Sequence, residues 1–235
     1  MKIVFMGTPD FSVPALEELA KVHQVAAVVT QQDRPKGRGH KMQYTPVKEK
    51  ALELNIPVYQ PEKVKNPEFV DILREINPDV IVVIAFGQIL SKEILDLPKY
   101  GCINVHASLL PKYRGAAPIQ WAVIDGEEET GVTTMYMAEG LDTGDVIDTA
   151  VIKLDEKETG GSLFDKLAIE GGKLIVETLS KLENGTATRT QQDDEKSSYA
   201  GKITKELGQI DFTKPAVTIE RLIRGLNPWP SAYTT

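Results

Sequence analysis

The chain has 235 residues, of which 41% are apolar and 26% are charged, so it can bury a core and is not a disordered polypeptide. The formal net charge of −7 gives no support to a general nucleic-acid binder, although it says nothing of local patches. A single cysteine, Cys102, excludes an intramolecular disulfide and a cysteine-based zinc cluster. No apolar run approaches the roughly 20 residues of a membrane helix, and a strand-like run follows the first two residues. We therefore expect a cytoplasmic globular protein of one or two domains with no membrane partner.

Apolar runs and helical patterns alternate from residue 3 to residue 84. The apolar runs predict buried strands at 3–6, 25–29, 58–59 and 80–84. Apolar residues three or four apart predict helices near 11–20, 46–54 and 67–76, the first capped by Asp10 or Ser12. The run 80–84 is apolar throughout, which is typical of a parallel strand covered on both faces. This order predicts an α/β fold: a doubly wound, Rossmann-like, mostly parallel sheet with helices on both faces.

The second half carries longer elements and then turns polar. A strand is expected at 101–106, a helix at 117–124, and β-rich segments at 131–137 and 145–152 around the turn 139–144. A helix at 162–182, about 30 Å long, ends at Asn184-Gly185, and a further helix is expected near 215–224. Residues 186–207 are polar and aperiodic. We therefore predict a first domain over 1–189, a linker over 190–207, and the beginning of a second unit over 208–235, too short for a core of its own.

His106 is the most informative of the three histidines. It follows a predicted buried strand, and open α/β sheets bind ligands beyond the carboxyl ends of their strands. Asn104 lies two residues earlier, so the two side chains share a face if both belong to the strand. An amide can donate to a developing oxyanion, and an imidazole can donate or exchange a proton. Asn104 and His106 are equally consistent with a catalytic pair and with a structural, hydrogen-bonded pair. The other two histidines, His23 and His40, are expected on the solvated surface.

Asp142 lies in the glycine-containing turn 139–144. Turn aspartates usually bond to their own backbone, and position alone favours that interpretation. If the turn folds toward His106, the carboxylate instead orients the imidazole and favours its protonated form. Glu139 and Asp145 are competing carboxylates that the spacing does not exclude.

Positive charge is concentrated in residues 33–41, whose glycines and proline predict a flexible loop. The candidate cations are Arg34, Lys36, Arg38 and Lys41. Lys48 and Lys50 extend the basic character of the segment. It is either a solvated surface loop or a clamp for phosphates.

Several motifs of nucleotide-binding and hydrolytic enzymes are missing. The Gly-containing residues 6–10 form neither G-x-G-x-x-G nor a phosphate-binding P-loop with its lysine, so NAD or ATP binding is poorly supported. There is no G-x-S-x-G elbow, and Cys102 is expected in the core because it lies in an apolar strand. A protein nucleophile is thus not evident, which suggests group transfer between two substrates.

Two segments around these candidate residues resemble the formyltetrahydrofolate-dependent formyltransferases. The first is CINVHASLLPKYRGAAPIQ at 102–120, and the second is GLDTGD at 140–145. FMGTPDF at 5–11, DRPKGRG at 33–39 and NPWP at 227–230 are similar to the methionyl-tRNA branch of that family. The resemblance covers the whole chain in order.

The resemblance implies formyl transfer from 10-formyltetrahydrofolate to the α-amine of methionine on initiator tRNA, with no metal, by an enzyme that we expect to be a monomer. The implied catalytic residues are Asn104, His106 and Asp142, which reverses the preference for a purely local role of Asp142. The residues expected to contact the folate are Phe86, Gly87, Ile89, Ser108, Leu109, Leu110 and Pro111. The basic segment that holds Arg34, Lys36, Arg38 and Lys41 is expected to contact the tRNA acceptor end.

The family normally continues into a β-rich tRNA-binding domain, so residues 208–235 are expected to be the beginning of an incomplete one. Two other functions stay open. One is a formyltransferase for a small amine, such as an amino sugar-nucleotide or glycinamide ribonucleotide; with water as acceptor it would be a hydrolase of formyltetrahydrofolate. The other is a non-catalytic nucleotide-binding α/β module.

Overall fold

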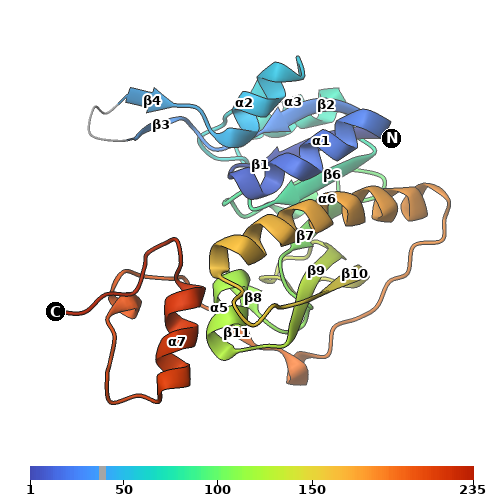
Figure 1. Cartoon of the computed structure of the whole chain (residues 1–235). Coiled ribbons are helices and arrows are strands. Elements are labelled where there is room, and N and C mark those ends of the chain that lie inside the picture. Colours follow the sequence, from blue (N-terminus) through green and yellow to red (C-terminus); the bar gives the residue numbers. More distant parts are fainter. Residues whose placement is uncertain (37–40) are drawn as a thin grey trace.

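A seven-stranded sheet forms the centre of the computed structural model, which describes residues 1–36 and 41–235, with only the backbone at 35, 36 and 41. The strand order is β10-β9-β7-β6-β1-β2-β5. The strands from β7 to β5 are parallel, and β9 and β10 continue the sheet in antiparallel pairing. The predicted mostly parallel sheet is therefore confirmed (Figure 1).

The elements agree closely with the ranges expected from the apolar patterns. The strands of the sheet are β1 (Lys2–Gly7), β2 (Gln24–Val29), β5 (Val58–Tyr59), β6 (Val80–Ile84), β7 (Cys102–His106), β9 (Glu129–Tyr136) and β10 (Val146–Lys153). The helices are α1 (Val13–Val22), α2 (Pro46–Glu53), α3 (Pro67–Ile76), α4 (Lys92–Leu95), α5 (Pro118–Asp125), α6 (Gly160–Glu183) and α7 (Ala216–Gly225). The single-turn α4 was not expected. Within the described residues, none of these helices has the length and apolar character to cross a membrane.

The strands are buried because their alternate side chains enter two separate apolar cores. In β1, Ile3 and Phe5 pack into the core that contains residues of α1, α2, α5 and α6. Val4 and Met6 point the other way, into the core with α3 and α4. Since successive side chains of a strand point to opposite faces, both sets must be apolar, which explains the continuous apolar runs. Figure 1 shows α1 and α6 packed side by side on one face, and the predicted helices on both faces are confirmed.

The start of α1 differs from the expectation, whereas the ends of α6 agree with it. A 3-10 turn, Asp10–Ser12, precedes α1, and neither expected side chain caps the helix. The hydroxyl of Ser12 instead donates to the carbonyl oxygen of Ile84 at 2.7 Å, which ties the helix to β6. The capping prediction was wrong because Ser12 already has helical dihedral angles. Helix α6 begins at Gly160, close to the predicted start at 162, after a capping box between Thr159 and Ser162 that was not predicted, and its C-cap is Asn184, where the sequence predicted the end.

The basic segment is a hairpin for part of its length. Strands β3 (Arg34–Lys36) and β4 (Lys41–Gln43) pair antiparallel and project from the body of the molecule (Figure 1). The expectation of a flexible loop is therefore corrected for these strands, since Pro35 is compatible with a two-stranded ribbon. Residues 37–40, with Arg38 and His40, lie outside the described residues, as do the side chains of Lys36 and Lys41.

Two lysines near the hairpin do not extend its basic surface as expected. The ammonium of Lys48 lies 2.5 Å from the carboxylate of Asp33, and both side chains are mostly buried. Lys50 pairs with Glu17 at 2.9 Å and with Glu53 at 2.5 Å. Their charges are thus neutralised locally.

The polar segment after α6 is folded against the first domain. Its strand β11 (Tyr199–Ala200) pairs in parallel with β8 (Arg114–Gly115), which lies within the loop that follows β7. Helix α7 then packs on α5. The segment that polar composition identified as a linker therefore contributes contacts to the region around His106, while the domain limits at 189 and 207 stay predictions.

Candidate active site

His106 is the last residue of β7, at the edge of the sheet where the parallel strands end. Its side chain is 8% exposed. Nε2 lies 2.8 Å from the carbonyl oxygen of Tyr113, and because a carbonyl only accepts, this nitrogen carries a proton. Nδ1 faces the carboxylate of Asp142 at 3.7 Å, beyond direct hydrogen-bond distance. One ring nitrogen is therefore fixed by the backbone, and the other can bond to a reacting group.

Asp142 approaches His106 from the turn between β9 and β10. It has the left-handed φ of 52°, and its Oδ2 accepts a hydrogen bond from the backbone N–H of Gly115 at 2.8 Å. Gly144 makes the turn possible, because a Cβ there would lie 1.6 Å from the carbonyl oxygen of Tyr136. The carboxylate thus points to the loop after β7 and not to its own backbone.

Asn104 shares the face of β7 that carries His106. The two residues alternate with Ile103 and Val105, which belong to the core on the other face. The Asn104 residue is 9% exposed, so its side chain is mostly buried at this edge of the sheet. A side-chain amide has two N–H donors, and one of them can serve a substrate oxygen.

The two competing carboxylates have other contacts. Asp145 pairs with the guanidinium of Arg189 at 2.7 Å, and this guanidinium also lies 4.2 Å from the centre of the Tyr136 ring. Glu139 lines a separate cavity. Of the three candidates, Asp142 is therefore the one that faces His106.

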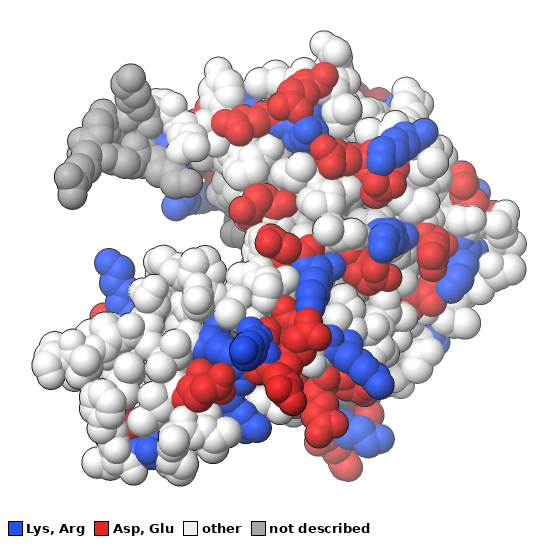
Figure 2. Space-filling model, viewed as in Figure 1, with Lys and Arg blue, Asp and Glu red and all other residues white. Residues whose placement is uncertain are grey.

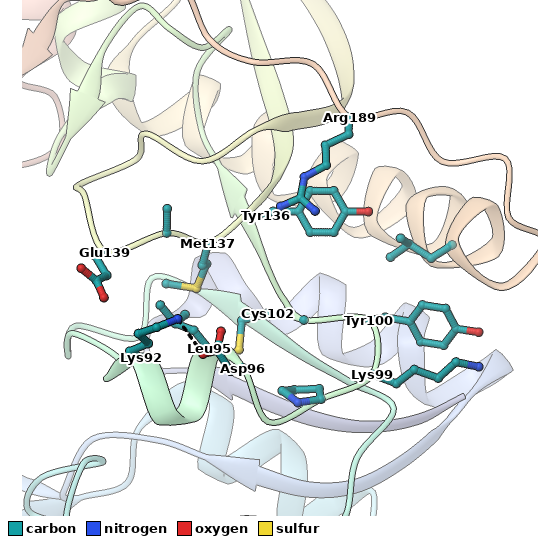
Figure 3. A pocket seen from close by; sticks show the side chains of 14 residues that line it. Lys92, Leu95, Asp96, Lys99, Tyr100, Cys102, Tyr136, Met137, Glu139 and Arg189 are labelled. Atoms are coloured by element: carbon teal, nitrogen blue, oxygen red, sulfur yellow. Dashed lines mark hydrogen bonds and ion pairs between the residues drawn. The ribbon is translucent and has the colours of Figure 1, made fainter.

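That cavity, of about 590 Å³, lies where Cys102 begins β7, whereas His106 ends the strand. Of its charged side chains, Lys92 pairs with Asp96 at 2.7 Å, and Arg189 lies beside Tyr136 (Figure 3). Cys102 is a core residue, as expected. Its burial raises the pKa of the thiol to about 12, so the thiol does not provide a thiolate nucleophile. Elsewhere, too, the described residues include no group of three His, Cys, Asp or Glu side chains that could hold a metal.

The first predicted folate segment follows β6. Phe86 is 2% exposed, and its carbonyl oxygen accepts from Thr8 Oγ1 at 3.0 Å and from Gln31 Nε2 at 3.1 Å. Gly87 has a φ of 85°, and Ile89 is 87% exposed. The loop is thus anchored at Phe86 and presents Gly87 and Ile89 outward.

The second predicted folate segment, 108–111, follows β7 and leaves the same edge of the sheet. Ser108 is fully buried, and its hydroxyl donates to a backbone carbonyl of the same loop at 2.6 Å. The hydroxyl of Thr133 donates to the Ser108 carbonyl at 2.7 Å and accepts from the Leu110 N–H at 3.2 Å. Leu109 and Pro111 are half-buried. The segment therefore has fixed ends and a partly open middle.

A cleft of about 480 Å³ lies between the hairpin and the sheet edge. Phe86 and Gly87 line one side of it, and Arg34 and Tyr44 line the other. The structure thus brings one predicted tRNA-binding residue, Arg34, to the same cleft as two predicted folate residues. Elsewhere, acidic and basic side chains are interspersed on the right-hand part of the face, while its lower left part is mostly uncharged (Figure 2).

Comparison with known proteins decides the family. A family model described as Formyl transferase matches residues 1–179, and one described as Formyl transferase, C-terminal domain, matches 202–235. The methionyl-tRNA formyltransferase of Agathobacter rectalis is 65% identical over 235 residues, which are 100% of this chain and 76% of that protein. The chain belongs to the methionyl-tRNA formyltransferases. The same enzyme of Clostridioides difficile is 60% identical over 236 residues, again 100% of this chain and 76% of that protein.

A solved relative supports the fold of this methionyl-tRNA formyltransferase. WlaRD, a sugar 3N-formyl transferase determined in the presence of dTDP and 5-N-formyl-THF, matches with a TM-score of 0.73. The match covers 96% of this chain and 78% of that chain, at 24% identity. At this identity the likeness shows the shared fold, and the Rossmann-like prediction is confirmed.

Three residues that the sequence analysis did not single out complete the site of this formyltransferase. Tyr113 holds His106, Gly115 holds Asp142, and Gln192 contacts the turn of Asp142. Gly115 has a φ of 116°, a conformation that favours glycine. A glycine at this point of the sequence could therefore have indicated a special backbone conformation. Gln192 gave no signal, because it lies in a polar segment that resembles a linker.

Proposed function

We propose that this chain transfers the formyl group of 10-formyltetrahydrofolate to the α-amine of methionine carried by initiator tRNA. The observation that carries the proposal is the His106 imidazole at the carboxyl end of β7, with one nitrogen bonded to the Tyr113 carbonyl and the other facing Asp142. Asn104, on the same face and mostly buried, supplies an amide donor. The 65% identity to a methionyl-tRNA formyltransferase supports the same reaction.

The two loops after β6 and β7 fit a folate. Ligand sites of this kind combine apolar walls with a few fixed polar groups. Phe86 and Leu110 are buried, while Gly87, Ile89 and Leu109 leave apolar surface open that a bound ring would cover. We assign the folate to these residues, with Ser108 and Pro111 fixing the shape of the second loop. When bound, the folate supplies the electrophilic formyl carbon.

Attack by the uncharged amine develops negative charge on the formyl oxygen. Asn104 donates its amide N–H to this oxygen, and protonated His106 donates from Nδ1, the nitrogen that no backbone group occupies. Each preorganised donor of this kind contributes roughly 3–4 kcal/mol to transition-state stabilisation. The water-poor surroundings of both side chains strengthen these bonds.

One proton must leave the attacking nitrogen, and one must reach the departing folate nitrogen. The Asp142 carboxylate, 3.7 Å from Nδ1, orients the His106 ring and helps the proton transfer. The Tyr113 carbonyl keeps the proton on Nε2, so that Nδ1 is the nitrogen that exchanges protons. None of these steps needs a nucleophile from the protein.

The tRNA acceptor is favoured over a small amine. The hairpin brings Arg34 to the cleft that Phe86 and Gly87 line, and a guanidinium there can bind a phosphate of the acceptor end. The sugar formyltransferase resembles this chain at 24% identity, which supports the fold and not the acceptor.

A formylation assay tests the proposal. The chain is incubated with 10-formyltetrahydrofolate and methionyl-tRNA, an amino sugar-nucleotide, glycinamide ribonucleotide or no acceptor. We expect formylmethionyl-tRNA to form, with little reaction of the small amines. Faster transfer to a small amine would overturn the tRNA assignment, release of formate without an acceptor would indicate a hydrolase, and no consumption of the folate would indicate a binding module.

A further inference from the structure

Gln192 connects the segment after α6 to the turn that carries Asp142. It is 8% exposed, although its neighbours in the chain are exposed. Its amide nitrogen donates to the carbonyl oxygens of Asp142 at 2.8 Å and of Gly144 at 2.7 Å. A side-chain amide has two N–H donors, and both are used on this turn.

The oxygen of the same amide holds Arg114. Gln192 Oε1 accepts from Nε of Arg114 at 3.0 Å and from Nη2 at 2.8 Å. The Arg114 side chain is 12% exposed, and it also pairs with Asp194 at 2.8 Å. Gln192 is therefore a bridge between the 142–144 turn and the loop after β7.

Arg114 lies between the two backbone groups that hold the candidate catalytic residues. The carbonyl of Tyr113 bonds to His106, and the N–H of Gly115 bonds to Asp142. The N–H of Arg114 itself donates to the carbonyl of Ser198 at 2.8 Å, within the pairing of β8 with β11. The segment from 192 to 200 therefore fixes this loop through both a side chain and a strand.

We propose that Gln192 and Arg114 are positioning residues, which set the placement of Asp142 against His106 and make the segment after α6 part of the catalytic unit. This inference rests on the proposed function. Tyr113 and Asp142 both have left-handed φ values, 59° and 52°, which persist only where surrounding bonds hold them. Removal of the Gln192 amide leaves two turn carbonyls without their donors and leaves the mostly buried Arg114 guanidinium with Asp194 but without the Gln192 oxygen, so the turn relaxes and Asp142 moves.

The first experiment separates positioning from a general loss of structure. Gln192→Ala is compared with Gln191→Ala, a matched change at the exposed neighbour. Gln192→Glu keeps the size and the acceptor for Arg114 but removes both donors to the turn. We expect kcat for formyl transfer to fall at least about tenfold in both Gln192 variants, with KM for either substrate within about threefold, and no change in Gln191→Ala.

The second experiment asks whether Gln192 acts through Asp142. In an Asp142→Ala background, Gln192→Ala should cost less than about threefold, because no carboxylate remains to be positioned. Equal losses in both backgrounds, or wild-type kcat in Gln192→Glu, would overturn the proposal. If Gln192→Ala does not fold, Gln192→Glu carries the same cycle.

A third measurement does not depend on activity. The ring ¹⁵N resonances of His106 should shift in Gln192→Glu and stay unchanged in Gln191→Ala; unchanged resonances in both variants would contradict the inference. The wild-type protein could fail to formylate methionyl-tRNA while the His106 resonances still shift in Gln192→Glu. That result would contradict the proposed function but not the positioning role of Gln192.

Discussion

The carboxylate of Asp142 lies 3.7 Å from Nδ1 of His106, yet its hydrogen bond comes from the backbone of Gly115. The carboxylate is thus held near the imidazole without a direct hydrogen bond to Nδ1 of His106. This arrangement places a negative charge where an imidazolium can form and leaves Nδ1 to bond to a substrate.

The first prediction concerns these two residues. His106→Ala and Asp142→Asn should each lower the single-turnover rate of formyl transfer by roughly 10²–10⁴-fold, because they remove the proton donor and the carboxylate that helps the proton transfer. Asp142→Asn keeps an oxygen that can accept from Gly115, so its melting temperature should change little. Near-normal rates in either variant would show that the pair is structural.

The second prediction concerns Asn104. Asn104→Ala should lower kcat by roughly 10²–10³-fold with a small effect on KM, because the amide acts on charge that develops in the transition state. Asn66→Ala is the control, since Asn66 is exposed and caps no helix with its side chain. A rise in KM at constant kcat would assign Asn104 to ground-state binding instead.

The third prediction concerns the hairpin. Replacement of Arg34, Lys36, Arg38 and Lys41 by alanine should weaken tRNA binding and reduce the log–log salt slope by roughly 0.7–0.9 per lost phosphate contact. Lys173→Ala removes an exposed cation on α6, away from the hairpin, and should leave the slope unchanged. The same slope in both variants would exclude a phosphate clamp.

The fourth prediction uses a pair of glycines. Gly115→Ala places a Cβ 2.7 Å from both the Ala200 carbonyl and the Tyr199 ring, whereas Gly185→Ala meets nothing within 4 Å. Both have positive φ values, so both should lose about 1–3 kcal/mol of stability. Gly115→Ala alone should also lower kcat, because its loop holds His106 and Asp142. Equal activity of the two variants would argue against that link.

The fifth prediction concerns pH. Burial alone would raise the pKa of Glu158, but hydrogen bonds from Lys166 and Ser162 outweigh it, and the pKa is lowered. Because the pKa is lower in the folded state, ionised Glu158 stabilises the folded protein fully at pH values above the carboxyl's unfolded-state pKa. This stabilisation is lost as the pH falls through the folded-state pKa. Glu158→Gln should therefore lower the unfolding free energy by about 1–3 kcal/mol at pH 7.

Urea unfolding at several pH values checks this prediction. The difference from wild type should shrink below about pH 4, and Glu156→Gln, at an exposed position, should show little effect. A difference that is constant with pH would mean that the charge of Glu158 contributes nothing.

The sequence by itself determined the sheet and the identity of the candidate residues. Residues such as Val80 and Ile81 are apolar because opposite faces of one strand enter different cores, and that pattern is visible along the chain. His106 could be placed at a strand end, and the resemblance over 102–120 and 140–145 selected Asp142 from three nearby carboxylates.

Only the tertiary structure decided how the site is held together. Tyr113, Gly115 and Gln192 act through backbone groups or through contacts between residues far apart in the chain, and no local periodicity records such contacts. For the same reason, the sequence alone predicts Lys48 as part of a basic surface, although Asp33 pairs with it in the structure. The polar composition of 190–207 predicts a linker, because composition does not reveal which polar residues make buried hydrogen bonds. In the structure, Gln192 of this segment makes such bonds to the 142–144 turn.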